Sequence, residues 1–318
     1  MSATLPTPDA VRNAAARIAA HARVTPVMQS AALDALLGAS LHFKCEHLQV
    51  SGAFKFRGAC NAVWSLSGEE AAHGVVTHSS GNHGHALALA AATRGIAAHV
   101  VVPEGAVRAK VEAIEAAGAT LHRCAPTQAA RETVTAEVQA ATGATLVHPY
   151  ADARVMAGQG TAALELMQQA GPLDALITPI GGGGLVSGCA IIGHALAPEL
   201  HIFAAEPEGA DDAARSLARG ERTAVANPNT ICDGLRATIG EPNLAALRTQ
   251  HIEVLTVGDK ETIAAMRLLW QHLKQTVEPS SATVLAALLK HRERFAGQRV
   301  GVVLTGGNVD LDALPWMQ

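Results

Sequence analysis

The feature that most constrains this chain is the regular alternation of short apolar segments with longer amphipathic ones. Segments 98–102 and 175–180 are almost continuously apolar, as strands covered on both faces of a sheet usually are. Short strands that alternate with helices of about 12 residues form βαβ units around parallel sheets. The sequence therefore predicts an α/β fold.

The predicted elements run along the whole chain without a repeat of fixed period or an obvious linker. Segment 220–243, rich in Asn, Pro and Gly, is predicted to be a loop. The predicted helices cover residues 8–22, 54–66, 82–94, 106–117, 128–141, 155–169, 184–196, 210–219, 259–275 and 281–293, and the predicted strands cover 40–47, 74–78, 97–102, 119–123, 144–148, 174–180, 200–206, 251–257 and 299–304.

The composition excludes several classes of function. The 318 residues are 49% hydrophobic and only 16% charged, with a formal net charge of −4. Such a chain is neither disordered nor a polybasic binder of nucleic acid or membrane surfaces. Aromatic residues make up 3%, too few for a platform that stacks bases. We therefore expect no nucleic-acid partner and no membrane partner.

The cysteines and the first helix indicate a cytoplasmic protein. The five cysteines are widely spread, odd in number and form no Cys-x-x-Cys pair, so we expect buried thiols rather than disulfides or a zinc ribbon. The first helix carries charged residues, unlike the apolar stretch of a secretion signal. The longest stretch without Asp, Glu, Lys or Arg, 175–198, is interrupted by Pro179 and by glycines, which favours a buried strand and helix over a membrane span.

The first segment that could carry chemistry is Ser51-Gly-Ala-Phe-Lys-Phe-Arg-Gly58. A lysine acts as a nucleophile only after it loses a proton, and its ordinary pKa is about 10.4. The apolar neighbours Phe54 and Phe56 and the nearby cation Arg57 would favour that loss at Lys55. By itself the segment also fits the commoner case of a lysine that buries its stem and exposes its ammonium.

The second segment is Thr77-His-Ser-Ser-Gly-Asn-His-Gly-His85, which joins an apolar strand to a helix rich in Ala and Leu. The free N–H groups of a helix N-terminus, together with hydroxyls, form an anion site, and a carboxylate is a plausible ligand. An ordinary N-cap turn is the alternative. The three histidines suggest a transition metal only weakly, because no carboxylate or cysteine joins them locally.

The third segment, Pro179–Gly188, places four consecutive glycines between a strand and a helix. Without side chains, backbone N–H groups can close around a phosphate, and the helix dipole favours the negative charge. The segment fits neither a Walker A loop nor a Gly-x-Gly-x-x-Gly motif. A flexible turn is the alternative, although four glycines carry a large entropic cost.

The fourth segment is Val302–Asp310, in which a buried strand ends at Thr305, Gly306 and Gly307. Thr305 would offer a neutral hydrogen-bonding partner at the carboxyl edge of the sheet, although a simple strand-ending turn is equally compatible. Taken together, the four segments provide an amine, a phosphate cradle, an anion site and a hydroxyl. That set suits an aldehyde cofactor with a phosphate tail, namely pyridoxal 5'-phosphate.

Six motifs also resemble those of the fold-type II pyridoxal-phosphate enzymes, in particular the serine/threonine dehydratase and serine racemase group. The resemblance implies two open, twisted, mostly parallel sheets flanked by helices. The motifs occur in the family's order from about residue 40 to 312, and they are SGAFKFRGA, THSSGNHGHALALAA, HPYADARVMAGQGT, PIGGGGLVSG, AAEPEGADD and LTGGNVD.

The resemblance assigns cofactor-binding roles residue by residue. Lys55 corresponds to the Schiff-base lysine, which also moves the substrate's α-proton, and Phe54 to the aromatic side chain near the cofactor ring. Asn82 corresponds to the partner of the cofactor's 3-hydroxyl, and Thr305 to the partner of the pyridine nitrogen. The phosphate cradle corresponds to Gly181, Gly182, Gly183 and Gly184.

The substrate side of the site is implied in the same way. Ser79, Ser80, Asn82 and His83 resemble the loop that binds the substrate carboxylate. In racemising relatives the second serine, here Ser80, is the acid/base opposite the lysine. Arg131 lies where some relatives bind a second substrate carboxylate, as in hydroxyaspartate, although a surface arginine on helix 128–141 is the alternative.

A divalent-cation site is a further implication of the resemblance. Glu206, Asp212 and the main-chain carbonyl of Ala210 are similar to that site, and hard oxygen donors suit Mg²⁺ or Ca²⁺ with water completing the shell. A solvated acidic turn is the alternative interpretation.

From the resemblance we expect a cytoplasmic homodimer with a large cofactor-binding domain made of 1–66 and 147–318 and a small domain, 67–146. The expected reaction is β-elimination from a small β-hydroxy amino acid, such as L-serine, L-threonine or L-threo-3-hydroxyaspartate, to a 2-oxo acid and ammonia. Tyr150 and Ala237 replace residues typical of racemases, which favours dehydration. A racemase or bifunctional enzyme is the main alternative, and a non-catalytic protein on the same scaffold is a second.

Overall fold

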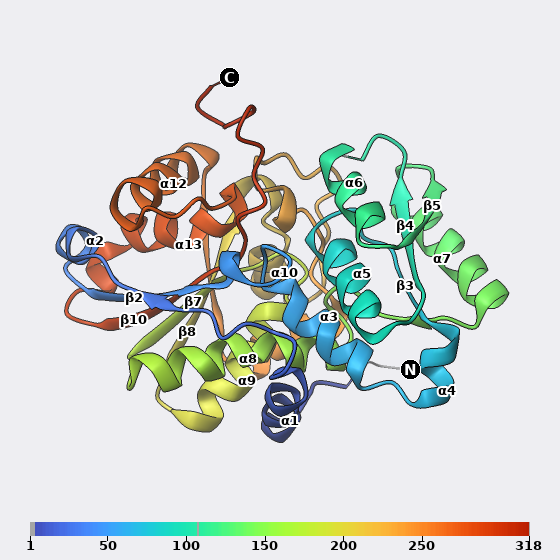
Figure 1. Ribbon diagram of the computed structural model, residues 1–318. Coiled ribbons are helices and arrows are strands. Elements are labelled where there is room, and N and C mark those ends of the chain that lie inside the picture. Colours follow the sequence, from blue (N-terminus) through green and yellow to red (C-terminus); the bar gives the residue numbers. More distant parts are fainter. Residues whose placement is uncertain (1–3, 107, 318) are drawn as a thin grey trace.

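The strands pair into two separate sheets, each flanked by helices, in the computed structural model, which describes residues 4–106 and 108–317. Figure 1 shows a larger lobe that contains β2, β7, β8 and β10 and a smaller lobe that contains β3, β4 and β5. Helix α3 runs between the two lobes. The predicted α/β fold with two mostly parallel sheets is confirmed.

The larger sheet has six strands in the order β1-β2-β10-β7-β8-β9. All neighbours are parallel except the two-residue strand β1, which is antiparallel to β2. The strands are β1 (Val27–Met28), β2 (Ser40–Cys45), β7 (Ala175–Pro179), β8 (His201–Pro207), β9 (Glu253–Val257) and β10 (Arg299–Leu304).

Alternating side chains of this sheet face two hydrophobic cores. On β7, Ile177 packs into the core beneath α12 and α13, whereas Leu176 packs into the core formed with α1, α8 and α9. Both faces are therefore covered, which explains why the strands read as continuous apolar runs. Figure 1 shows these two helix layers above and below the sheet.

The smaller sheet has four parallel strands in the order β5-β4-β3-β6. They are β3 (Val75–Thr77), β4 (Ala98–Pro103), β5 (Thr120–Cys124) and β6 (Thr145–Leu146). Helices α5 and α6 pack on one face and α7 on the other. All four strands fall inside segment 67–146, the predicted small domain.

The α-helices of the described residues agree well with the predicted ones, and two of them, α5 and α9, have the predicted bounds. Helices α2, α4 and α11 were not predicted. The α-helices are α1 (Pro8–Ile18), α2 (Ala31–Leu37), α3 (Lys55–Trp64), α4 (Gly68–His73), α5 (Asn82–Arg94), α6 (Arg108–Ala116), α7 (Gln128–Thr142), α8 (Ala153–Ala170), α9 (Gly184–Leu196), α10 (Asp212–Arg219), α11 (Glu241–Thr249), α12 (Asp259–Leu273) and α13 (Pro279–Lys290).

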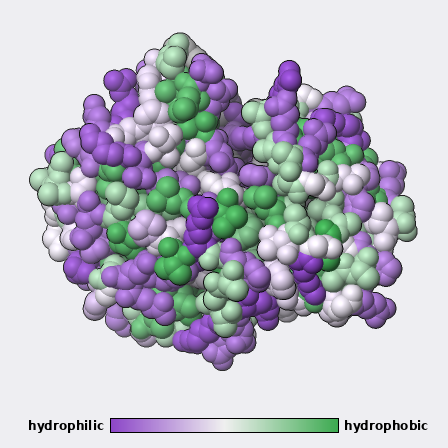
Figure 2. Space-filling model, in the orientation of Figure 1, coloured by the Kyte–Doolittle hydropathy of each residue, from purple (hydrophilic) through white to green (hydrophobic). Residues whose placement is uncertain are grey.

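Short 3-10 helices complete the chain: η1 (Glu46–Leu48), η2 (Glu208–Ala210), η3 (Asp233–Leu235) and η4 (Arg292–Arg294). Within the described ranges, none of the helices combines the length and apolar character needed to cross a bilayer. Figure 2 shows the surface hollowed between the two lobes at the top of the view.

Candidate active site

The predicted chemical segments all follow the carboxyl ends of parallel strands. Segment 78–81 follows β3 in the smaller sheet, whereas 180–183 and 305–308 follow β7 and β10 in the larger one. Ligands of open α/β sheets bind at this edge. Lys55 is the first residue of α3, which follows β2 and η1 along the chain.

Lys55 is held as a candidate amine at the start of α3. Its Nζ donates a hydrogen bond to the carbonyl oxygen of Pro149 at 2.9 Å and lies 5.1 Å from the centre of the Phe54 ring. Burial lowers the pKa of Lys55 to about 8, and the Glu278 carboxylate opposes that shift. About a tenth of the amine is therefore neutral at pH 7, far more than for a lysine with its ordinary pKa.

Arg57 does not help to lower the pKa of Lys55, contrary to the expectation from sequence. Its fully buried guanidinium donates to both oxygens of Glu46, at 2.6 and 2.8 Å, and to both oxygens of Glu165, each at 2.8 Å. Lys44 also donates to Glu165. The network joins β2, α3 and α8. It therefore anchors the first turn of α3, and the Arg57 charge does not disfavour the protonated form of Lys55.

The glycine loop is packed closely against Tyr150 and α11. A Cβ on Gly182 would collide with the Tyr150 ring, and one on Gly184 would lie 3.0 Å from Tyr150 Cα. Gly183 caps α9 with a φ of 91°, a conformation that only glycine adopts easily. The loop and Lys55 therefore meet at residues 149–150.

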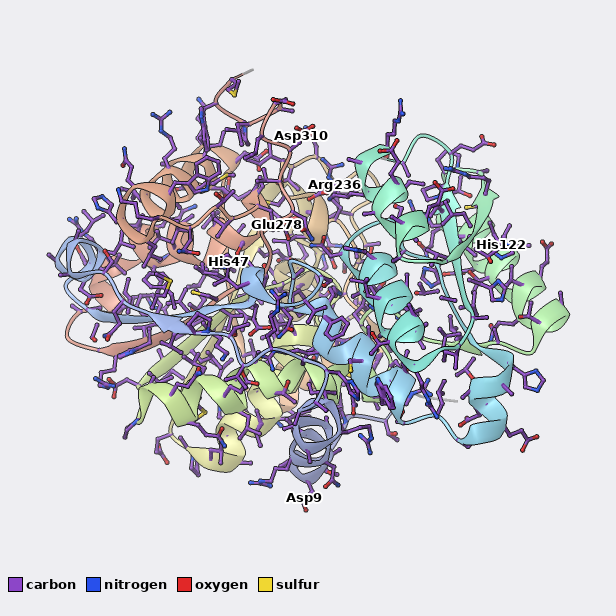
Figure 3. The ribbon with its side chains drawn as sticks, in the orientation of Figure 1. Asp9, His47, His122, Arg236, Glu278 and Asp310 are labelled. Atoms are coloured by element: carbon purple, nitrogen blue, oxygen red, sulfur yellow. The ribbon has the colours of Figure 1, made fainter. Side chains whose placement is uncertain are left out.

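Asn82 is hydrogen-bonded to Glu278, a carboxylate that lies outside the predicted site motifs. Its Nδ2 donates to both oxygens of Glu278, at 3.0 and 3.2 Å, and its Oδ1 accepts from Asn308 Nδ2 at 2.9 Å. Glu278 is 4% exposed, and Figure 3 shows it near the centre of the molecule. Burial, followed by the nearby Asp233, raises the pKa of Glu278 to about 7.

Thr305 and Phe54 come together at the start of α3. The Thr305 carbonyl accepts a hydrogen bond from Phe54 N at 2.9 Å, and Ala53 pairs with Gly306 in an isolated bridge. Gly306 O in turn accepts from Glu278 N at 3.0 Å. The contacts with Glu278 and with residues 53–54 therefore bring Thr305, Asn82 and Lys55 into one region of the molecule.

The serine loop differs from the adjacent His83 in accessibility. Ser79, Ser80 and Asn82 are partly exposed, whereas His83 is buried. His83 Nε2 donates to Val147 O at 3.2 Å, and its Nδ1 is buried without a partner among the described residues. Burial, and then Lys55, lowers the pKa of His83 well below its ordinary value. A neutral His83 in this arrangement accepts rather than donates a hydrogen bond at Nδ1.

Arg131 lies near the start of α7. Its side chain is only partly exposed, and its Nε is buried without a hydrogen-bond partner among the described residues. Burial lowers the pKa of His78, and the Arg131 guanidinium adds to that lowering. Arg131 therefore lies close enough to His78, the residue before Ser79, to affect its protonation.

The predicted cation ligands lie at the carboxyl end of β8, in η2 and at the start of α10. Glu206 is fully buried, and its two oxygens accept from Ala213 N at 2.8 Å and Ala214 N at 2.9 Å. Burial raises the pKa of Glu206 to about 8, and the Asp212 carboxylate contributes. The side chains of the described residues contain no cluster of three acidic, histidine or cysteine ligands. Two carboxylates and the Ala210 carbonyl would still suit a hard cation that keeps several waters.

Comparison with known proteins places this site in a family. A family model described as "Pyridoxal-phosphate dependent enzyme" matches residues 18–306. The chain belongs to the pyridoxal-phosphate dependent enzymes. It is 49% identical to the beta-hydroxyaspartate dehydratase of Paracoccus denitrificans, over 98% of this chain and 99% of that protein. It is 46% identical to the serine racemase of Dictyostelium discoideum, over 96% and 95% of the two chains.

A solved structure of this family agrees with the fold. Maize serine racemase superposes with a TM-score of 0.95 at 44% identity, over 98% of this chain and 96% of that one. The described residues of this pyridoxal-phosphate enzyme fit the cofactor on their own geometry. They provide an amine with a lowered pKa, a glycine loop at a helix N-terminus, and buried polar atoms such as His83 Nδ1 that lack partners.

Proposed function

We propose that this enzyme removes water from a β-hydroxy amino acid to give a 2-oxo acid and ammonia, with L-threo-3-hydroxyaspartate as its preferred substrate. The observation that carries the substrate choice is Arg131, whose buried Nε has no partner among the described residues and which lies beside His78. A guanidinium with a free donor suits a second carboxylate. The similarity to a beta-hydroxyaspartate dehydratase supports the same choice.

Lys55 is the proposed catalytic base. When bound, pyridoxal phosphate supplies an aldehyde that condenses with amines and a ring that withdraws electrons from the substrate's α-carbon. The lowered pKa of Lys55, about 8, lets its neutral amine take the α-proton and return to the ammonium form. Pro149 O holds Nζ in place, and Phe54 packs beside it.

The remaining groups orient the two molecules. The proposed cofactor partners are Asn82 for the 3-hydroxyl, Thr305 for the ring nitrogen and Gly181–Gly184 for the phosphate. The partly exposed Ser79 and Ser80 would bind the α-carboxylate, and Arg131 the β-carboxylate. The α-proton goes to Lys55, and the β-hydroxyl takes a proton from the Lys55 ammonium and leaves as water. The released enamine tautomerises to an imine, and hydrolysis of that carbon–nitrogen double bond gives oxaloacetate and ammonia.

A racemase is the second candidate function, and Ser80 favours it. Ser80 is partly exposed in the loop that precedes α5, so its hydroxyl is accessible to a ligand. Racemisation needs an acid on the face of the α-carbon opposite the base, and a serine there could return the proton. The similarity to a serine racemase supports this candidate.

We also propose a homodimer, a cytoplasmic location, and a Mg²⁺ or Ca²⁺ ion held by Glu206, Asp212 and the Ala210 carbonyl. The two buried carboxylates support the cation, because neither takes part in an ion pair among the described residues and burial raises both pKa values. Light scattering of the purified chain tests the dimer: a mass near twice 32.7 kDa is expected.

A panel of substrates tests the proposed reaction. Purified enzyme is incubated with L-threo-3-hydroxyaspartate, L-serine and L-threonine, and both 2-oxo acid and D-amino acid are followed. We expect oxaloacetate and ammonia to form fastest from hydroxyaspartate. Arg131→Met should lose this preference while L-serine turnover remains, because L-serine has no second carboxylate. Equal loss with both substrates would remove the proposed role of Arg131.

A further inference from the structure

We propose that Asn243 is a positioning residue that orients the backbone N–H groups of the glycine loop toward the cofactor's phosphate. Asn243 lies in the first turn of α11 and is completely buried. Its Nδ2 lies 3.1 Å from Tyr150 O and 3.2 Å from Ser187 Oγ. One side chain thus contacts both the segment that holds Lys55 and the helix that follows the glycine loop.

The contact with Ser187 continues to the loop itself. Ser187 Oγ donates to Gly183 O at 2.7 Å, and Ser187 N donates to the same oxygen at 3.0 Å. Because the Ser187 hydroxyl donates its proton to Gly183 O, the same hydroxyl oxygen accepts from Asn243 Nδ2. Asn243 therefore holds the Ser187 hydroxyl in its orientation. Asn243 Cβ also limits the space at Gly183, because a Cβ there would lie 2.7 Å from it.

The neighbouring carbonyl is fixed from the same side. Gly240 N, just before α11, donates to Gly182 O at 3.1 Å. In a planar trans peptide, the carbonyl of one residue points away from the N–H of the next. Because the carbonyls of Gly182 and Gly183 are engaged by Gly240 and Ser187, the N–H groups of Gly183 and Gly184 point in the opposite sense. Those N–H groups belong to the N-terminus of α9, where a phosphate is favoured.

Asn243 also connects the loop to the catalytic lysine. Tyr150, whose carbonyl accepts from Asn243, directly follows Pro149, whose carbonyl holds Lys55 Nζ. The same Tyr150 packs its ring against Gly182. The distance between the amine and the phosphate cradle is therefore set in part by this single buried amide. The proposal depends on cofactor binding alone, and not on which amino acid is the substrate.

The test compares the affinity of the full-length, cofactor-depleted enzyme for pyridoxal phosphate and for pyridoxal, which lacks the phosphate. Binding is followed by equilibrium dialysis for the wild type, Asn243→Ala and Ser187→Ala. For Asn243→Ala we expect the affinity for pyridoxal phosphate to fall about tenfold or more, with pyridoxal affinity changing much less. Ser187→Ala should shift the ratio of the two affinities in the same direction.

The matched control is Asn61→Ala. Asn61 is also a buried asparagine, but it donates to Arg154 O and accepts from Arg17, away from the glycine loop. The control should leave the affinity ratio unchanged even where it lowers stability. An unchanged ratio in the Asn243 and Ser187 variants, or an equal change in the control, would overturn the proposal. If Asn243→Ala fails to fold, the Ser187→Ala ratio alone decides in the same way.

Discussion

At the scale of single residues, the site depends on ionisable groups whose protonation is changed by burial. Lys55 and Glu278 have pKa values of about 8 and about 7, so each titrates near neutral pH. Asn82 has two roles that use the same amide. It donates to Glu278, and it is the proposed partner of the cofactor's 3-hydroxyl. A bound cofactor would therefore compete with Glu278 for the Asn82 amide.

Replacing Lys55 by alanine should lower turnover by about 10³-fold or more, because the proposed base is lost. The absorption of bound cofactor in the visible range should also disappear while the far-ultraviolet circular dichroism stays that of the wild type, which separates loss of the amine from a general loss of folding. Lys260→Ala provides a control, because Lys260 is an exposed lysine on α12. Substantial activity in Lys55→Ala would count against the mechanism.

Glu278→Gln should stabilise the cofactor-free protein at high pH and have little effect at low pH. The pKa of Glu278 is raised above its ordinary value, so the folded state favours the protonated acid. Its contribution to stability is complete below pH 4 and is lost as the pH rises through 7. Above pH 7 the variant should be more stable by up to about 3 kcal/mol. Urea unfolding at pH 5 and pH 8 measures the difference, and a pH-independent difference would contradict it.

The residues that sequence could not identify are those whose role depends on distant partners. Lys55, Asn82 and the four glycines occur in motifs that could be recognised directly. Glu278 reads in sequence as an acid before Pro279 at a helix start, and its partner Asn82 lies 196 positions away. Asn243 likewise lies in a segment predicted to be a loop.

At the scale of elements, the helix and strand ends could be predicted where turn residues punctuate the pattern. Helix α5 begins after Gly81 and ends before Gly95, and its bounds match the prediction. The elements that were not predicted are too short to show a periodic pattern of hydrophobic residues. Strand β1 has two residues, and the six-residue α4 is recognisable only by the capping box of Ser67 and Glu70. Helix α11 carries Pro242 near its start, which favoured a loop in the sequence pattern although proline is tolerated there.

The carboxylates beside α10 carry a prediction at this scale. Adding Mg²⁺ or Ca²⁺ should raise the melting temperature of the enzyme, because a ligand that binds only the folded state stabilises it. Glu206→Gln should remove this response, since it removes one anionic ligand from a buried pair. Differential scanning fluorimetry with and without EDTA measures it. The same thermal shift in the variant would show that the cation binds elsewhere.

At the scale of the whole molecule, polar contacts link the two lobes. Asn82 and Asn308 join α5 to the segment after β10, and Lys110 of α6 forms an ion pair with Asp233 of η3. A hydrophobic core also joins the lobes, because Phe56 and Val63 of α3 pack in one cluster with Leu87 of α5. A change in the relative position of the lobes would therefore have to repack this core as well as break the polar contacts.

The Lys110–Asp233 ion pair should contribute little to stability, because both side chains are partly exposed. A double-mutant cycle with Lys110→Ala and Asp233→Ala should give a coupling of about 0.2–1 kcal/mol in the unfolding free energy. The coupling should disappear in about 1 M salt, where charges are screened within roughly 3 Å. A larger coupling that resists salt would mean that the lobes are held together far more rigidly than this contact implies.

The measurement that tests the central claim most directly is the product formed from L-threo-3-hydroxyaspartate by the purified enzyme carrying pyridoxal phosphate. We predict stoichiometric oxaloacetate and ammonia, at a higher kcat/KM than L-serine shows for pyruvate, and a turnover lower by about 10³-fold or more with Lys55→Ala. Accumulation of a D-amino acid in place of the 2-oxo acid would contradict the account and identify a racemase.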